Sequence, residues 1–389
     1  MSELTYLEKL LDGAEVEWFS VNDVFDIFAG GDIPKDSLSD IQTDEYNIPI
    51  YSNGIGSRAL YGWTNKAKID APSLTISARG TIGWTSYQEN PFFPVVRLLV
   101  LTPKIQLNLK YSYYFMKMIE GDYKVPKTGI PQLTKPMLKD IKLPIPCPDN
   151  PEKSLAIQSE IVRILDTFTA LTAELTAELT AELSMRKKQY NYYRDQLLSF
   201  DDAEVEWKTL GELAENLDSK RKPITSGLRE AGKIPYYGAS GIVDYVKDYI
   251  FDGDFLLVSE DGANLLARNT PIAFSISGKT WVNNHAHVLK FDTYAARRYV
   301  EYYLNSIDLT TYISGAAQPK LNKKNLESIR IPNPPPEEKE RIVSILDKFD
   351  ALTNSITEGL PREIEFRQKQ YEYYRDMLFS FPKPDVVEA

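Results

Sequence analysis

Two long stretches of the chain carry apolar residues at steps of three and four, the spacing that places side chains on one face of an α-helix. In the first stretch, about 152–199, these positions are Ile161, Ile164, Phe168, Leu171, Leu175, Leu179, Leu183, Tyr190, Tyr193 and Leu197. In the second they are Ile342, Ile345, Phe349, Leu352, Ile356, Leu360, Ile364, Tyr371, Tyr374 and Leu378. A helix over the first stretch would be roughly 70 Å long at 1.5 Å per residue. No single small core covers that length, so we expect the two helices to pair antiparallel. Gly359 and Pro361 predict a kink or interruption in the second.

The chain also repeats itself. AEVEW at 14–18 recurs at 203–207, and LTKPMLKDIKLP at 133–144 matches LNKKNLESIRIP at 321–332. Within the helices, EIVRILDTFTALT at 160–172 matches RIVSILDKFDALT at 341–353, and RKKQYNYYRDQLLSF at 186–200 matches RQKQYEYYRDMLFSF at 367–381. The order is therefore module, helix, module, helix. We expect a first module over 1–150, a first long helix over 151–200, a second module over 201–332, and a second helix with a C-terminal tail over 333–389.

The two modules have mixed character. Short β-rich runs such as 73–77 and 255–259 alternate with Gly, Pro and Asn turns, and one Tyr-rich helical stretch lies near the end of each module, at 111–120 and 294–306. The predicted fold class is α+β, with two repeated globular modules joined by a pair of long antiparallel helices that have internal pseudo-twofold symmetry.

Composition places this architecture in a globular protein. The chain has 389 residues, of which 43% are hydrophobic, and its single cysteine, Cys147, excludes an internal disulfide and a CxxC metal site. The longest apolar run, 95–101, is far shorter than the ~20 residues that cross a bilayer. The first residues lack the basic and apolar blocks of a signal peptide. We therefore expect a cytoplasmic protein that contacts no membrane.

The net charge of −10 argues at first against a polyanionic partner. The charge is not uniform, however. Residues 20–145 carry 14 basic and 12 acidic side chains, and residues 203–330 carry 16 of each. The acidity lies in the N-terminal segment and in the two helical regions. A neutral module can still present a basic face, although a solvated charged surface explains each basic cluster about equally well.

Several motifs resemble catalytic or cofactor sites and fail on inspection. Ser277–Thr280 reads SGKT, but a phosphate loop needs a glycine where Ala273 stands. Gly54-Ile55-Gly56 is followed by turn residues instead of the long helix of a dinucleotide site. Asn333-Pro334-Pro335 lacks the aromatic residue of an amino-methyltransferase motif, because Pro336 follows. His285 and His287 have no third metal ligand nearby in sequence. We expect no catalytic residue and no metal site.

The residues quoted above, together with the spacer TAELTAELTAEL at 172–183 and the segment 260–289, resemble the DNA-specificity subunit of type I restriction-modification enzymes, of the IC subclass. The similarity covers nearly the whole chain. It implies a non-catalytic subunit whose two target recognition domains each read half of a bipartite, asymmetric double-stranded DNA site. Two methyltransferase subunits and two restriction/translocase subunits would complete the complex. S-adenosylmethionine, ATP and Mg²⁺ would belong to those partners, and this chain would bind no cofactor.

Candidate contact residues follow from basic, amide and aromatic side chains in the modules. The predicted DNA contacts are Arg58, Lys66, Arg79, Lys220, Arg221, Lys279, Asn283, Asn284 and Lys323. The predicted contacts to partner subunits are Tyr190, Tyr193, Arg194, Tyr371, Tyr374 and Arg375. For the stretch 279–285, a hydrogen-bonded turn before a strand is the competing interpretation.

The TAEL repeat suggests the hypothesis that the length of the helix sets the spacing between the two half-sites. Four residues advance a helix by ~6 Å and turn it by ~400°, whereas one base pair advances 3.4 Å. Each TAEL unit would then change the half-site spacing by one to two base pairs, and a plain spacer without metrical role is the alternative. Two further functions compete with DNA reading: a coiled-coil adaptor whose modules bind proteins, and a self-sufficient DNA methyltransferase, which the missing cofactor motifs disfavour.

Overall fold

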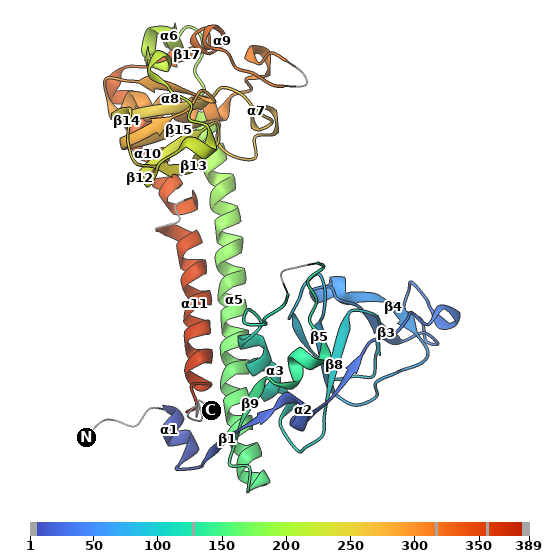
Figure 1. The fold of residues 1–389 in the computed structure, drawn as a ribbon. Helices are drawn as coiled ribbons and strands as arrows, with labels where there is room; N and C mark the ends of the chain where they lie inside the picture. The colour runs from blue at the N-terminus through green and yellow to red at the C-terminus, as the bar shows by residue number, and fades with distance from the viewer. Residues whose placement is uncertain (1–5, 127–128, 316–317, 355–357, 383–389) are drawn as a thin grey trace, which may run out of the picture. The chain divides into compact units, whose positions relative to one another are not determined.

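The computed structural model describes residues 6–126, 129–315, 318–354 and 358–382. The chain forms two compact units: unit 1 comprises residues 1–177 and 365–389, and unit 2 comprises residues 178–364. The long helix α5 (Pro151–Leu197) and the helix α11 (Gly359–Leu378) are each divided between the two units, with one part of the helix in unit 1 and the other in unit 2 (Figure 1). Of the helices in the described ranges, none combines the length and apolar character needed to cross a membrane.

Unit 1 is built on a four-stranded sheet of order β2-β8-β5-β6 and a three-stranded sheet of order β4-β3-β7 (Figure 1). Its strands are β1 (Val16–Ser20), β2 (Phe25–Ala29), β3 (Ile48–Tyr51), β4 (Leu60–Thr64), β5 (Ser73–Ser77), β6 (Thr85–Gln88), β7 (Phe93–Pro94), β8 (Leu98–Pro103) and β9 (Lys142–Pro146). Its helices besides the long ones are α1 (Tyr6–Leu11), α2 (Val21–Val24), α3 (Leu109–Met118) and α4 (Lys135–Lys139).

Unit 2 is built on one six-stranded sheet of order β11-β16-β14-β15-β12-β13. Its strands are β10 (Glu206–Thr209), β11 (Glu215–Asn216), β12 (Ala231–Gly238), β13 (Gly241–Val246), β14 (Phe251–Ser259), β15 (Ala273–Val282), β16 (Ala286–Lys290) and β17 (Arg330–Asn333). Its helices are α6 (Leu210–Leu213), α7 (Asn264–Ala267), α8 (Tyr294–Ser306), α9 (Lys323–Glu327) and α10 (Pro336–Asn354). The α+β prediction and the two Tyr-rich helices, α3 and α8, are confirmed.

The repeated sequences at the two ends of each module pair with each other. Strand β1 runs antiparallel to β9 with Trp18 opposite Pro144, and β10 runs antiparallel to β17 with Trp207 opposite Pro332. The two ribbons therefore have the same register. A two-stranded ribbon at the base of each unit brings the start and the end of the module together, directly before the long helix that follows.

The end of α11 completes the core of unit 1. Phe379 and Phe381 are 3% and 4% exposed, and the ring of Phe379 lies 5.2 Å from that of Tyr111 and 5.6 Å from that of Phe115, both on α3. The indole Nε1 of Trp18 donates a hydrogen bond to the carbonyl oxygen of Pro382 at 2.7 Å. Residues more than 360 positions from the N-terminal strand are thus part of the same apolar core.

The end of α5 does the same in unit 2. Leu198, which follows the helix, is 5% exposed and belongs to the core that contains Tyr299 and Tyr303 of α8, and Phe200 packs against that core. The repeat RDQLLSF/RDMLFSF therefore encodes a core-filling segment at the end of each long helix.

The predicted helix pairing is confirmed inside each unit. In unit 1 the ring of Phe168 on α5 stacks on Tyr374 of α11 with 5.2 Å between centroids and 7° between planes. In unit 2 the equivalent stack joins Phe349 of α10 to Tyr193 of α5, at 5.7 Å and 27°. The middle of the stripe is less covered than expected, since Leu171 is 48% exposed and α5 has no fully buried residue after Leu165. Two adjacent helices protect only a narrow seam.

The predicted interruption of the second helix is confirmed as well. Helix α10 ends at Asn354 and α11 begins at Gly359, whose φ is +77°. A Cβ atom at this position would lie 2.5 Å from the carbonyl oxygen of Ala351, so a side chain would clash with the preceding helix. Ile356 of the predicted stripe lies outside the described residues.

A carboxylate on each long helix holds the neighbouring Tyr-rich helix. In unit 1, Asp166 of α5 accepts a hydrogen bond from the Tyr114 hydroxyl at 2.6 Å and from Lys110 Nζ at 2.9 Å. In unit 2, Asp347 of α10 accepts from the Tyr302 hydroxyl at 2.6 Å and from Arg298 Nη2 at 2.9 Å. We call each set, Lys110/Tyr114/Asp166 and Arg298/Tyr302/Asp347, an aspartate clamp.

The clamps differ in burial. Burial and the hydrogen bond to Asp166 raise the pKa of Tyr114, and the side chains of Lys110 and Asp166 are 44% and 41% exposed. Arg298 and Asp347 are only 12% and 28% exposed, and Tyr294 donates a further hydrogen bond to Asp347 at 2.7 Å. The clamp of unit 2 is the drier and more connected of the two.

We therefore expect Asp347→Ala to destabilise unit 2 by about 2 kcal/mol, because it removes the acceptor of two tyrosine hydroxyls and one of the carboxylates that pair with the buried Arg298. Asp166→Ala should cost less, and the control Asp26→Ala should cost almost nothing because Asp26 is 77% exposed in its pair with Lys104. Thermal unfolding of the three variants measures the order. Equal losses for Asp347→Ala and Asp26→Ala would refute the role of the clamp.

Candidate nucleic-acid interface

The predicted DNA contacts of unit 1 lie on its strand-rich part. Arg58 is exposed on a 3₁₀ turn, Gly56–Ala59, before β4, and Lys66 is exposed directly after β4. Neither makes an ion pair with a described residue. Arg79 follows β5 and is half-buried, with Nε and Nη2 donating to Oε1 of Gln132 at 2.9 and 2.5 Å. The structure thus leaves two free cations and one oriented guanidinium.

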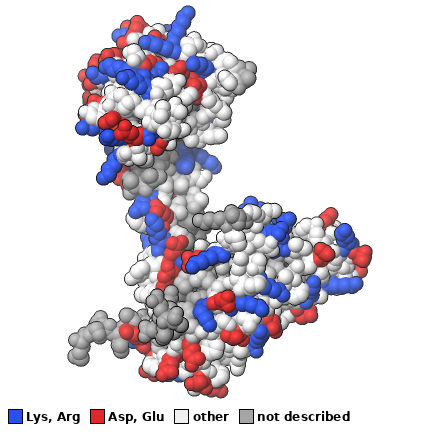
Figure 2. Space-filling view, in the orientation of Figure 1, with Lys and Arg blue, Asp and Glu red and all other residues white. Residues whose placement is uncertain are grey.

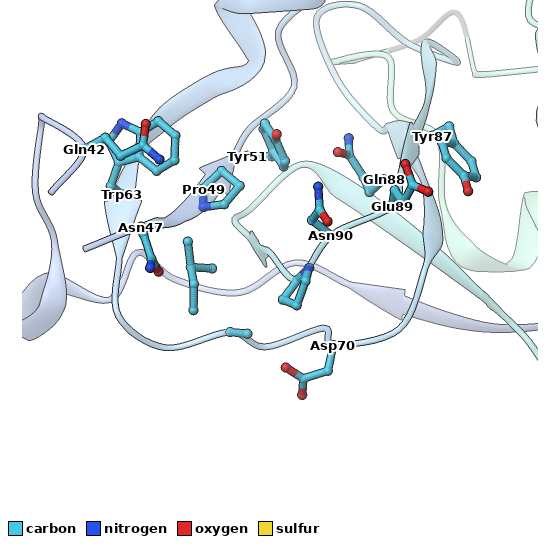
Figure 3. Close-up of a pocket in the computed structure, with 13 residues that line it drawn as sticks. Gln42, Asn47, Pro49, Tyr51, Trp63, Asp70, Tyr87, Gln88, Glu89 and Asn90 are labelled. Atoms are coloured by element: carbon cyan, nitrogen blue, oxygen red, sulfur yellow. The ribbon is translucent and has the colours of Figure 1, made fainter. Parts of the chain in front are cut away.

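A cleft of about 740 Å³ lies beside β3, β4 and β6 in unit 1 (Figure 3). Its lining includes four amide side chains, three aromatic rings and two carboxylates: Gln42, Asn47, Gln88, Asn90, Tyr51, Trp63, Tyr87, Asp70 and Glu89. Within the described residues the amides of Gln42 and Asn90 make no hydrogen bond. Amides are the side chains that pair with both hydrogen-bonding atoms of an adenine edge. The sequence reasoning missed this group because its members are scattered over 42–90.

The predicted contacts of unit 2 separate into two groups. Lys220, Lys279 and Asn284 are exposed, and Lys279 Nζ lies 4.6 Å from the ring centroid of Tyr249. Lys323 on α9 pairs with Glu327 at 3.6 Å.

Asn283 is instead 7% exposed: its Oδ1 accepts from the backbone N–H of His285 at 2.8 Å, and its own N–H donates to Tyr237. This is the hydrogen-bonded turn that was the competing interpretation of the segment.

Arg221 lies in a buried ionic cluster, which the sequence did not predict. Its Nη1 donates to Glu260 Oε2 at 2.6 Å, and its Nη2 lies 3.3 Å from Asp218 Oδ2. His287 is fully buried, with Nδ1 2.6 Å from Asp218 Oδ2 and Nε2 donating to the Leu321 carbonyl at 2.7 Å. Burial alone would raise the pKa of Asp218, but the hydrogen bond and charge of His287 outweigh it and lower that pKa. Arg221 thus has a structural part in holding β16 to the rest of the unit.

Asp218, Glu260 and His287 form the one group in the described residues with metal-ligand geometry. Both carboxylates already bind cations, however, because Lys320 Nζ also lies 3.1 Å from Glu260 Oε1. The imidazole has one nitrogen committed to a carbonyl oxygen. This donor set is charge-balanced by the protein itself, which favours a structural cluster over a metal site.

The rejected motifs have ordinary structural places. The SGKT segment lies within strand β15, with Gly278 at a φ of +78° opposite Gly253 of β14. Gly54–Gly56 is a turn before β4. Asn333 ends β17, and its Oδ1 accepts from Lys339 Nζ at 2.5 Å.

The predicted partner contacts are split between helix pairing and the surface. Tyr193 and Tyr374 form the two aromatic stacks, Tyr371 accepts from Thr169 Oγ1 at 3.3 Å, and burial raises the pKa of Tyr190 to about 12. Arg194 and Arg375 make the same ion pair with the next residue, Asp195 and Asp376, at 2.7 Å.

Two tyrosines that were not predicted are more exposed, Tyr192 at 62% and Tyr373 at 66%. Both are the first tyrosine of the repeated YY pair. This repetition in the sequence could have identified them as candidate partner contacts.

Charges of both signs are interspersed on the face of each unit seen in Figure 2. Neither unit presents an unbroken positive surface in this view, in agreement with the near-neutral balance counted along the modules. A nucleic acid would therefore meet individual cations among polar and aromatic groups.

Comparisons with known proteins identify the family. The family model described as the type I restriction modification DNA specificity domain matches residues 14–185 and 203–366, one match for each half of the chain. The chain belongs to this family. It is 40% identical to the EcoR124I/EcoR124II specificity subunit of Escherichia coli over 423 aligned residues, covering 100% of both chains. It is also 40% identical to the EcoprrI specificity subunit of E. coli over 92% of this chain and 93% of that one.

Solved structures show the same fold. A chain from a study of complex assembly and conformational transition of the type I R-M system aligns with a TM-score of 0.60 at 13% identity, over 94% of this chain and 97% of that one. The S subunit of a type I restriction-modification system from M. genitalium aligns with a TM-score of 0.50 at 18% identity, over 98% and 99%. The fold of this chain is thus shared with these two structures at low sequence identity.

The buried cluster predicts acid sensitivity of unit 2. The pKa values of Asp218 and Glu260 are lowered from their ordinary values of 3.8 and 4.5. Because these pKa values are lowered, the two carboxylates stabilise the folded unit fully at pH values above their ordinary pKa values. This stabilisation is lost as the pH falls through the lowered pKa values. Asp218→Asn should therefore lower the unfolding temperature at pH 7 and flatten its decline between pH 5 and pH 3, whereas Asp252→Asn, at an exposed position, should change neither. A decline as steep as that of the unchanged protein would contradict the assignment.

Proposed function

We propose that this chain is the non-catalytic specificity subunit of a type I restriction-modification complex and reads a bipartite, asymmetric site in double-stranded DNA. The single observation that carries the proposal is the duplicated specificity-domain match on two compact units. Two units with the same ribbon register and the same clamp but different sheets are suited to read two different half-sites. Through this reading the subunit directs both methylation and restriction.

The catalytic work falls to partner subunits in this proposal. Two methyltransferase subunits supply S-adenosylmethionine chemistry, and two restriction/translocase subunits use ATP and Mg²⁺. The repeated YY and RD positions at the ends of α5 and α11 support a pair of equivalent docking sites. Arg58, Lys66, Lys220, Lys279 and Asn284 are the predicted DNA contacts whose exposure fits a direct role.

Binding to duplex DNA by the chain in complex with its methyltransferase subunits tests the proposal. The affinity should fall steeply between 50 and 200 mM salt, because each phosphate contact releases counterions. Lys66→Ala should weaken binding to all duplexes alike and reduce the salt dependence, and Lys9→Ala, at an exposed position of α1, serves as the control. Binding that does not depend on salt would favour the protein adaptor instead.

The TAEL repeat provides a second test. The division between the two units falls inside it, between Ala177 and Glu178, and α5 runs through it without a break. Deleting residues 176–179 removes one TAEL repeat and shortens the helix by ~6 Å. We expect the preferred spacer between the half-sites to shorten by one to two base pairs while both half-sites stay the same. Mapping of modified adenines measures this, and an unchanged spacer would refute the metrical role.

A further inference from the structure

Backbone hydrogen bonds reveal a shared frame at the strand ends of the two units. In unit 1 the N–H of Ala78 donates to the carbonyl of Arg97 at 2.8 Å, and in unit 2 the N–H of Glu260 donates to the carbonyl of His285 at 2.8 Å. These bonds link the ends of β5 and β14 to the residues that precede β8 and β16. The two hydrogen bonds therefore occupy equivalent places in the two units.

Further bonds extend the correspondence. The carbonyl of Ala78 accepts from the N–H of Leu133 at 2.9 Å, and that of Glu260 accepts from Leu321 at 2.7 Å. A third pair joins Val95 N–H to the Tyr51 carbonyl at 3.0 Å and Asn283 N–H to the Tyr237 carbonyl at 3.1 Å. Three segments of each unit thus converge at equivalent points: the end of β5 or β14, the turn before β8 or β16, and the segment before α4 or α9.

The frame places three pairs of side chains at equivalent positions. They are Arg79 and Asp261, Arg97 and His285, and Gln132 and Lys320. Each pair differs in charge or hydrogen-bonding character, although the backbone beneath it is the same. The repeat in the sequence does not bring the first pair into register. The number of residues from Ala78 to Glu260 is six smaller than the number from Arg97 to His285.

Glycine fixes the turn in both units. Gly80 follows Arg79 with a φ of +74°, and Gly262 follows Asp261 with a φ of +105°. A Cβ atom at Gly80 would also lie 2.8 Å from Asn53 Nδ2, whose amide donates to the Arg79 carbonyl at 2.7 Å. Arg97 itself has a φ of +80°, a costly conformation for a residue with a side chain. This backbone holds the side chains in defined directions.

Neighbours within each frame orient the polar groups. The Arg79 guanidinium donates Nε and Nη2 to Gln132, and no residue in the described ranges accepts from Nη1. The carboxylate oxygens of Asp261 both lie 2.9 Å from Nδ1 of His285, and the Asp261 and His285 side chains are 34% and 51% exposed. Arg97 and Lys320 are exposed. Oriented, partly exposed polar groups are the side chains that discriminate bases in the major groove.

We propose that these equivalent positions determine specificity, with Arg79 reading a guanine in one half-site and Asp261 reading the amino group of a cytosine in the other. An arginine donates to the O6 and N7 acceptors of guanine, and an aspartate accepts from the N4 amino group of cytosine. The inference rests on the proposed function and deepens it: one frame presents opposite hydrogen-bonding character in the two units, so that one chain reads two unlike half-sites.

The test is selection of duplexes from a random library by the chain assembled with its methyltransferase subunits. Arg79→Lys keeps the charge but removes the fork geometry, and it should reduce the preference at one base pair of one half-site by about 10- to 100-fold. Asp261→Asn should do the same at one base pair of the other half-site. Arg163→Lys and Asp292→Asn, outside the frame, are the matched controls.

The unaffected half-site reports in each experiment that the complex is folded and bound. Uniform weakening of all duplexes without a change in preference would overturn the inference, because the side chains would then contact the DNA backbone. Unchanged selection by both variants, from a complex that selects a bipartite sequence normally, would overturn this inference alone. If the unchanged complex selects no sequence, the proposed function fails and the inference falls with it.

Discussion

The end of each long helix completes an apolar core whose other parts lie far away in sequence, and the rest of the architecture depends on this closure. Phe379 and Phe381 enter the core of unit 1 beside α3, and Leu198 enters that of unit 2 beside α8. Removing a buried Phe side chain from a core costs about 3–5 kcal/mol, a large fraction of the stability of a typical domain. Unit 1 is therefore built from two separate pieces of chain, whereas unit 2 is one contiguous piece, residues 178–364, and each unit contains the end of a helix that begins in the other.

The aspartate clamps and aromatic stacks fix how the long helices are oriented where they complete these cores. A core alone allows side chains to repack, whereas Asp166 and Asp347 bind a hydroxyl and a cation on the same helix face and so define its register against the long helix. The stacks of Phe168 with Tyr374 and of Phe349 with Tyr193 lie two residues further along the same helices and join them to their partner helices. Such rigid attachment supports the proposed DNA contacts, because Arg79 and Asp261 lie on turns that need a fixed base.

The sequence predicted the features that periodicity and duplication encode. The long helices, the break at Gly359, the Tyr-rich helices and the α+β class follow from short-range patterns. Sheet order did not follow, since strand pairing joins residues such as Trp18 and Pro144 across the whole module. Arg221 looked like a free cation in a basic run, but its partner Glu260 is 39 positions away. The correspondence of Arg79 with Asp261 was hidden by a local change in length.

Hydrogen exchange of a chain that ends after Leu378 tests the closure most directly. The account predicts that amides of β5 and β8 in unit 1 lose protection relative to the full chain, because the core loses Phe379 and Phe381, while amides of β14 and β16 in unit 2 keep theirs. Unchanged protection in β5 and β8, or an equal loss in both units, would contradict the claim that the end of the second helix completes the first unit.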